Sequence, residues 1–361
     1  MTTAQPAAAP AHLGSDYAEL SRTIRDAGLL RRRYGYYLLT IGLTIAAFAS
    51  AWVVFGLLGN SWWQLFVAGF LALVCTQLSF IGHDAGHKQI FRGRRANDAM
   101  GLLHGGLVGL SYGWWVSKHN RHHANPNHED DDPDLDIPAL AFTIGQGRTK
   151  NGLTRFIAKY QAFLFFPLLL LEGLNLHWAS IQAVWRGEVK LNRLEKALLA
   201  TNIAVYLVAV FLVLSPGIAV LFIVVHQCVW GAYMGCSFAP NHKGMPTLTT
   251  GHSLDFLRKQ VLTSRNVRGG WWVDFTLGGL NYQIEHHLFP SMPRSNLPHA
   301  RPIVRAYCLA RGIEYTECGV LASYAKVLAH LNAVGAPLRR LPATPQPDHH
   351  TQRKRMPPHG H

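Results

Sequence analysis

"YYLLTIGLTIAAFASAWVVFGLLG", residues 36–59, contains no charged side chain along its whole length. An α-helix rises 1.5 Å per residue, so about 20 apolar residues cross the ~30 Å hydrocarbon core of a bilayer. Three further stretches share this length and lack of charge, at residues 62–82, 197–214 and 217–236. The sequence therefore predicts an all-α integral membrane protein with four transmembrane helices.

Two other apolar stretches do not fit a simple span. Residues 163–181 include Pro167 and Glu172, and a carboxylate inside a bilayer is costly. We expect a helix lying in the membrane interface, with a kinked span as the alternative. Residues 101–112 are too short to cross, and we expect them to be re-entrant or packed on the cytoplasmic side.

The charge distribution predicts topology. The net charge is +14, and arginines flank the spans at 31–33 and at 92–95. Positive residues mark the cytoplasmic side of a membrane protein, so the termini and long loops are expected to face the cytoplasm. Basic residues placed beside spans do not indicate nucleic-acid binding. The same surface could attract anionic headgroups or dock an acidic electron carrier.

The chain divides into three expected regions. Residues 1–30 form an N-terminal cytoplasmic segment, partly disordered, and residues 31–336 form the membrane domain with a cytoplasmic helical cap. Residues 337–361 mix proline, histidine and basic residues, a composition typical of a disordered tail. The five cysteines form no CxxC pair, so a disulfide framework is not expected.

Histidines are concentrated in three short windows. They are "HDAGH" (83–87), "HNRHH" (119–123) and "QIEHH" (283–287). Residues at i, i+3 and i+4 share one face of a helix, so each window can direct its imidazoles at one point. With four spans, all three windows fall on the cytoplasmic side. The predicted metal ligands are His83, His87, His119, His122, His123, His286 and His287.

An eighth ligand is expected from His242, which follows the fourth span on the same side. His226 lies about four turns earlier and is expected to be a buried, hydrogen-bonded side chain. Imidazole suits iron, zinc, copper and nickel, and eight imidazoles are too many for one ion but enough for two. A set without cysteine disfavours a structural zinc site. An oxygen-activating di-iron pair, or a metal transporter or sensor, would each use such a set.

The three windows and their flanks resemble the histidine boxes of the membrane-bound fatty acid desaturases. The resemblance spans about residues 36–315 and includes "GWWVSKHNRHHANPN" and "GGLNYQIEHHLFPSMPR". It implies a non-haem di-iron centre that uses O2 and two electrons to place a cis double bond in an acyl chain. The eight histidines match the family's iron ligands. A di-iron lipid hydroxylase or mono-oxygenase is the alternative outcome at the same site.

Gln283 stands where some relatives have the first histidine of the third box. This "QxxHH" pattern resembles bacterial acyl desaturases and front-end desaturases without the cytochrome b5 domain. We expect Gln283 to support the site rather than to bind metal fully, with direct binding as the alternative. Three carboxylates are expected to orient imidazoles: Asp84, Asp134 and Glu285.

The resemblance also implies partners and a location. The substrate would be a long-chain acyl group on CoA, a carrier protein or a lipid, and one of Trp114 and Trp115 could line its channel. Electrons would come from a separate donor, such as ferredoxin or a flavin reductase drawing on NAD(P)H. A bacterial plasma membrane is expected. Chain length and bond position stay open.

Overall fold

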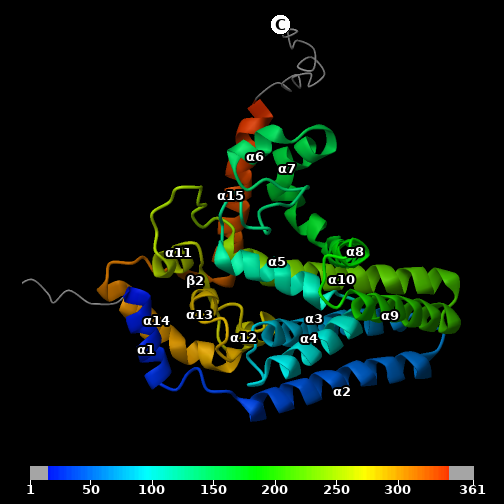
Figure 1. Ribbon diagram of the computed structural model, residues 1–361. Coiled ribbons are helices and arrows are strands. Elements are labelled where there is room, and N and C mark those ends of the chain that lie inside the picture. Colours follow the sequence, from blue (N-terminus) through cyan, green and yellow to red (C-terminus); the bar gives the residue numbers. More distant parts are fainter. Residues whose placement is uncertain (1–14, 341–361) are drawn as a thin grey trace, which may run out of the picture.

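The computed structural model describes residues 15–340, which fold almost entirely as helices (Figure 1). Four helices are long and apolar enough to cross a membrane, as the sequence predicts. They are α2 (Tyr34–Leu58), α3 (Gln64–Gly86), α9 (Asn192–Val213) and α10 (Pro216–His242). Helix α3 packs against α2 and α10, and α9 packs against α10. The chain is thus an all-α membrane protein.

Residues 101–112 are the end of a short helix and a tight turn. Helix α4 (Arg94–Val108) packs along α3, and the chain reverses at Gly109, where φ is +80°. The amides of Gly109 and Leu110 both donate to the carbonyl of Gly105. Helix α5 (Tyr112–Ala124) follows at once and carries the second histidine window.

Residues 163–181 do not form the single interfacial helix that the sequence suggests. They divide between α7 (Gly152–Leu169) and α8 (Glu172–Trp185), which meet at an 83° bend. Helix α7 packs against α15 (Val320–Arg340), whereas α8 packs against α10. Close packing fixes α8, because a Cβ at Gly173 would lie 2.8 Å from the carbonyl oxygen of Gln227. The two halves therefore follow different neighbours.

The remaining elements form a helical cap beside the four spans (Figure 1). Its apolar centre joins α1, α11, α13 and α14, and a short parallel pair, β1–β2, lies against α15. The bounds of these elements are α1 (Asp16–Asp26), α6 (Ile144–Thr149), α11 (Phe256–Leu262), β1 (Asn266–Arg268), α12 (Trp271–Thr276), α13 (Gln283–Leu288), η1 (Arg294–Asn296), α14 (Leu297–Ala310) and β2 (Glu317–Gly319).

Both expected terminal regions contain ordered helix. Within residues 1–30, α1 buries Leu20 and Ile24 in the cap. At the other end, α15 continues through Pro337 to Arg340, so the expected boundary at residue 337 is wrong. The reason is packing, because Leu338 is fully buried against Ala158 of α7. The disorder expected for residues 1–14 and 341–361 lies outside the described residues.

Candidate metal centre

Three separate helices bring the histidine windows together. The first window ends α3, the second occupies the last turns of α5, and the third lies on α13, whose six residues are all buried. Glu195 of α9 holds the start of helix α5. Its carboxylate accepts hydrogen bonds from the Ser111 hydroxyl (2.5 Å) and the Gly113 amide (3.1 Å). A carboxylate at this position satisfies one free N–H group of the first turn of α5, that of Gly113. The second window is therefore anchored at the far end of its own helix.

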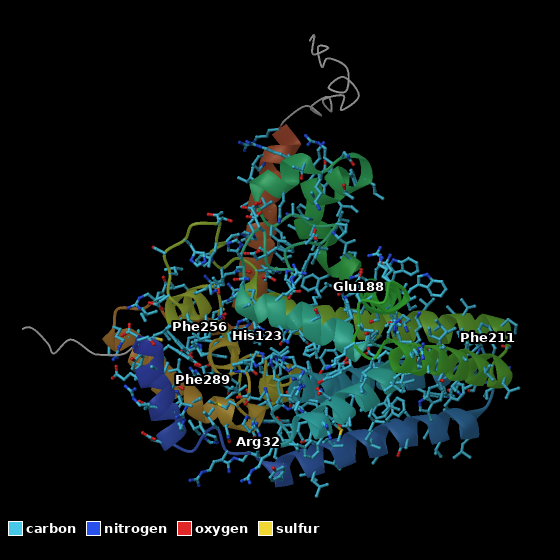
Figure 2. All side chains as sticks on the ribbon, viewed as in Figure 1. Arg32, His123, Glu188, Phe211, Phe256 and Phe289 are labelled. Carbon is cyan, nitrogen blue, oxygen red and sulfur yellow. The ribbon has the colours of Figure 1, made fainter. Side chains whose placement is uncertain are left out.

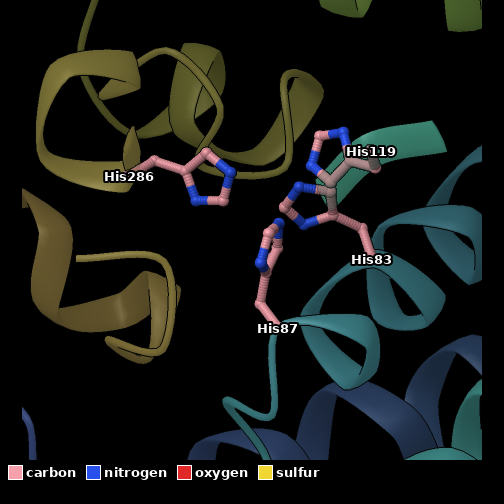
Figure 3. A group of neighbouring side chains, drawn as sticks. All are labelled: His83, His87, His119 and His286. Atoms are coloured by element: carbon pink, nitrogen blue, oxygen red, sulfur yellow. The ribbon is translucent and has the colours of Figure 1, made fainter. Parts of the chain in front are cut away.

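The first cluster contains four imidazoles from all three windows. Their ligand atoms lie within 4.8 Å of one another, and the rings face a common centre (Figure 3). The residues are His83, His87, His119 and His286. Among the described residues, Nε2 of His83, His87 and His286 has no hydrogen-bond partner although it is buried. An unpaired buried nitrogen costs about 1–3 kcal/mol, and a shared cation would satisfy all three atoms. The donor set thus fits a metal ion.

The second cluster is tighter. The Nε2 atom of His242 lies 3.3 Å from that of His122 and 3.1 Å from that of His287. Metal–imidazole bonds of about 2.0–2.1 Å, the length known for zinc, would place neighbouring nitrogens about 3 Å apart. Burial, and then the nearby imidazole of His242, hold the pKa of His287 well below its ordinary value. The ring is therefore neutral, as a metal ligand must be.

The opposite nitrogen of each ring in the second cluster faces an oxygen acceptor. The contacts from Nδ1 are His122 to Asp132 Oδ1 (2.9 Å), His242 to the Thr263 carbonyl (3.0 Å) and His287 to Gln260 Oε1 (2.9 Å). An acceptor at Nδ1 keeps the proton there and leaves the Nε2 lone pair free. Three such lone pairs, all within 4.8 Å of one another, repel one another, and a cation between them removes that repulsion.

His123 joins the two clusters. Its Nε2 lies 3.1 Å from Nε2 of His119, and its ring stacks on that of His287 with centroids 4.2 Å apart. The structure therefore brings together all eight histidines predicted from the sequence. His226 lies apart, with Nδ1 2.9 Å from the Tyr206 hydroxyl, in the buried and hydrogen-bonded state that was expected.

Gln283 lies at the edge of the second cluster. Its Nε2 is 2.8 Å from Nε2 of His242, and its Oε1 accepts a hydrogen bond from Asn241 Nδ2 (3.2 Å). The Asn241 Oδ1 atom has no hydrogen-bond partner among residues 15–340. Amide oxygen and nitrogen are assigned from such networks, and reversing both amides would turn Gln283 Oε1 toward His242 while Asn241 accepts. The geometry is compatible with a supporting role and with binding.

Asp84 links the first window to the chain after the third. Its Oδ1 lies 3.4 Å from Nδ1 of His83, and its Oδ2 forms a 2.9 Å ion pair with Nε of Arg294. Both charged side chains are buried. Asp84 therefore lies where the sequence places it, but its partner Arg294 was not foreseen.

The acidic run after the second window supplies a carboxylate that the sequence did not single out. Asp132 holds His122, whereas Asp134 lies farther from the same Nδ1 atom (3.5 Å) and pairs with Lys118 at 2.6 Å. Burial opposes ionisation of Asp134, but Lys118 and other positive groups outweigh it and lower its pKa below the usual range. The only sequence signal for Asp132 was its place in "NHEDDDPDLDIP" (127–138).

Glu285 departs from its expected role. Its carboxylate accepts hydrogen bonds from the Tyr315 hydroxyl (2.6 Å) and from Asn266 Nδ2 (2.7 Å), not from an imidazole. Asn266 Oδ1 in turn accepts from the Ile284 amide (2.9 Å). Burial raises the pKa of Glu285 to about 7. This trio fixes α13 in the cap, and so positions the third window indirectly.

An apolar cavity of about 60 Å³ reaches the first cluster from between the helices. His83 and Trp115 line it at the metal site, and Trp115 stacks on His119 with ring centroids 4.5 Å apart. The apolar lining comes mainly from Leu78, Val108, Leu110, Leu176, Met234 and Phe238. The cavity therefore offers a largely hydrocarbon surface beside a metal centre.

Comparison with known proteins agrees with this geometry. The family model described as fatty acid desaturase matches residues 60–319, which contain all three histidine windows. The chain belongs to the fatty acid desaturase family. Among relatives of this desaturase-family chain, the acyl-lipid (9-3)-desaturase of Physcomitrium patens is 30% identical over 340 residues, which are 88% of this chain. Fatty acid desaturase 3 of Bos taurus is 30% identical over 339 residues, covering 89% of this chain and 73% of its own length.

Other desaturases give the same level of similarity. The delta(6)-fatty-acid desaturase fat-3 of Caenorhabditis elegans is 30% identical over 330 residues, covering 87% of this chain and 74% of the nematode protein. This desaturase-family chain spans 62% of the length of the moss relative and 66% of that of the mouse fatty acid desaturase 2-like protein FADS2B.

Proposed function

We propose that the chain is an O2-dependent membrane desaturase that places a cis double bond in a long-chain acyl group. One observation carries the proposal: three Nε2 atoms of the second cluster converge while their Nδ1 atoms face oxygen acceptors. Imidazoles oriented in this way are typical metal ligands. Two bound irons would supply the O2 activation, fed by two electrons, that removes hydrogen from an unactivated acyl carbon.

The side chains divide between two proposed iron sites. His83, His87, His119 and His286 would hold one ion, and His122, His242 and His287 the other. His123 would serve at the boundary between them. We assign Gln283 a supporting role, as a hydrogen-bonding neighbour of the second site. No cysteine belongs to either cluster among the described residues, which favours iron over a structural zinc ion.

The apolar cavity is proposed to hold the acyl chain. Its lining excludes water and fixes acyl carbons next to His83 and Trp115, and this positioning is the protein's main contribution to such a reaction. The moss relative's name includes acyl-lipid, which supports a lipid-bound acyl group as the substrate, with acyl-CoA and an acyl carrier protein as the alternatives.

We place both clusters on the cytoplasmic side of a bacterial plasma membrane. Arginines at 31–33 and 92–95 flank the span ends nearest the clusters, which supports this orientation. The two electrons are proposed to come from a separate ferredoxin or a flavin reductase using NAD(P)H. Ligands at span ends, rather than along a midplane path, argue against a metal transporter.

The test is product analysis. The chain is expressed in a host supplied with defined saturated and monounsaturated fatty acids, and double-bond positions are mapped by mass spectrometry. A new cis double bond that disappears in His122→Ala is expected. Hydroxylated products alone would show the mono-oxygenase outcome and contradict the proposal.

A further inference from the structure

A second cavity, of about 630 Å³, lies at the start of α2 and shares no lining residue with the cavity at the metal centre. Its lining residues are Leu30, Arg31, Arg32, Tyr34 and Arg92. Two connections far apart in sequence form it, one between α1 and α2 and the other between α3 and α4. Figure 2 shows Arg32 at the beginning of α2.

The positive charge of the arginines that line this cavity, the arginine cleft, is not neutralised by carboxylates of the described residues. Neither Arg31 nor Arg92 lies within 4 Å of a carboxylate among residues 15–340, and both are exposed. Arg32 donates from Nη1 to the Ser291 carbonyl (2.8 Å), a contact that leaves its charge unpaired. Guanidinium groups gathered in this way repel one another, and they match the oxygens of a phosphate in shape and charge.

Both walls of the cleft are held by fully buried asparagines. Asn296 donates to the Leu29 carbonyl (2.7 Å) and accepts from Arg33 Nε (2.7 Å). On the other wall, Asn97 accepts from the Phe91 amide (3.1 Å) and donates to the Phe91 carbonyl (2.8 Å). The arginine backbones are therefore fixed before a ligand arrives, which lowers the entropy cost of binding.

The position of the cleft indicates where its ligand comes from. Helix α2 continues from the cleft with the exposed apolar side chains of Leu38 and Leu39, and Leu38 is 77% exposed. We propose that the arginine cleft binds the phosphate of an anionic glycerophospholipid, with the acyl chains of the lipid along these side chains of α2. The site is independent of the proposed desaturation, because none of its residues belongs to the metal centre or to the acyl cavity.

The test measures lipid retention without any assay of activity. Purified full-length protein in neutral detergent is titrated with phosphatidylglycerol or phosphatidylcholine, and bound lipid is counted by native mass spectrometry. Arg31→Gln/Arg92→Gln is compared with a charge-matched pair, Lys190→Gln/Arg193→Gln, at exposed positions around the start of α9. We expect phosphatidylglycerol binding to weaken about thirtyfold in the cleft pair, from about 1 kcal/mol per removed charge, and to stay unchanged in the control pair.

Two results would overturn the site. One is equal weakening in both pairs, which would indicate general charge attraction. The other is no weakening in the cleft pair while its melting temperature matches that of the unmodified chain. A competition experiment distinguishes a membrane lipid from a soluble phosphate as the ligand. If an equimolar amount of glycerol 3-phosphate displaces phosphatidylglycerol, the ligand is not a membrane lipid.

Discussion

Oδ1 of Asp132 lies 2.9 Å from Nδ1 of His122, and both side chains are buried. Because this contact sets which ring nitrogen carries the proton, Asp132→Ala should lower the affinity of the second metal site about 10–100-fold. Metal retained per chain against a graded chelator measures the effect. Asp131→Ala, at the exposed neighbouring position, is the control. Equal retention in the two variants would show that Asp132 does not orient the ligand.

The buried ion pair between Asp84 and Arg294 should be needed for stability. Arg294→Gln leaves a buried carboxylate without its cation, which costs about 3–5 kcal/mol of unfolding free energy. Asp84→Asn/Arg294→Gln should lose less than the sum of the two single changes, because it leaves neither charge unpaired. Denaturant unfolding in detergent measures these differences.

An exposed ion pair provides the control for the comparison of single and double changes at Asp84 and Arg294. Arg186 and Glu188 lie 3.9 Å apart on the surface, and Arg186→Gln should change the unfolding free energy by about 1 kcal/mol or less. Strict additivity of the Asp84 and Arg294 changes would refute the coupling.

Gln283 should affect turnover more than metal content. If it supports the second cluster through hydrogen bonds, Gln283→Ala should keep close to the full metal content while product formation falls. His287→Ala, which removes a proposed ligand, should lose one metal ion. Elemental analysis and product yield on the same samples separate the two effects. Loss of metal from Gln283→Ala equal to that from His287→Ala would instead make the amide a ligand.

Val108 should limit the acyl chain that the cavity accepts. Val108→Phe adds volume to a buried wall position, so the preferred substrate should become shorter by a few carbons or turnover of long chains should fall. Val54→Phe makes the same change on an exposed face of α2 and should leave the preference unaltered. Competition between acyl chains of different length, read by gas chromatography, provides the measurement. An unchanged preference in Val108→Phe would mean that the acyl chain binds elsewhere.

The spans and the histidine windows could be predicted because their signals are local. Length and lack of charge are sufficient to identify α2, and helical spacing is sufficient to align His119 with His122 and His123. Span parity then placed the three windows on one side, as the clusters require. These signals can be recognised without knowing which helices pack against one another.

The errors and omissions concern contacts between distant segments. The bend between α7 and α8 follows from α7 packing on α15 and α8 packing on α10, which residues 163–181 do not encode. Glu285 turned out to hold α13 through Asn266 and Tyr315, residues that no motif connects to it. The role of Arg294 likewise could not be predicted, because it depends on the ion pair with Asp84, which is distant in the sequence.

Metal content per chain tests the central claim most directly. The full-length protein is expressed with ample iron, purified, and analysed for all transition metals beside His286→Ala and His287→Ala. Two irons per chain are predicted, with one lost in each variant, because the two histidines belong to different clusters. Zinc without iron, or two irons retained in His286→Ala or in His287→Ala, would contradict a di-iron centre built from these histidines.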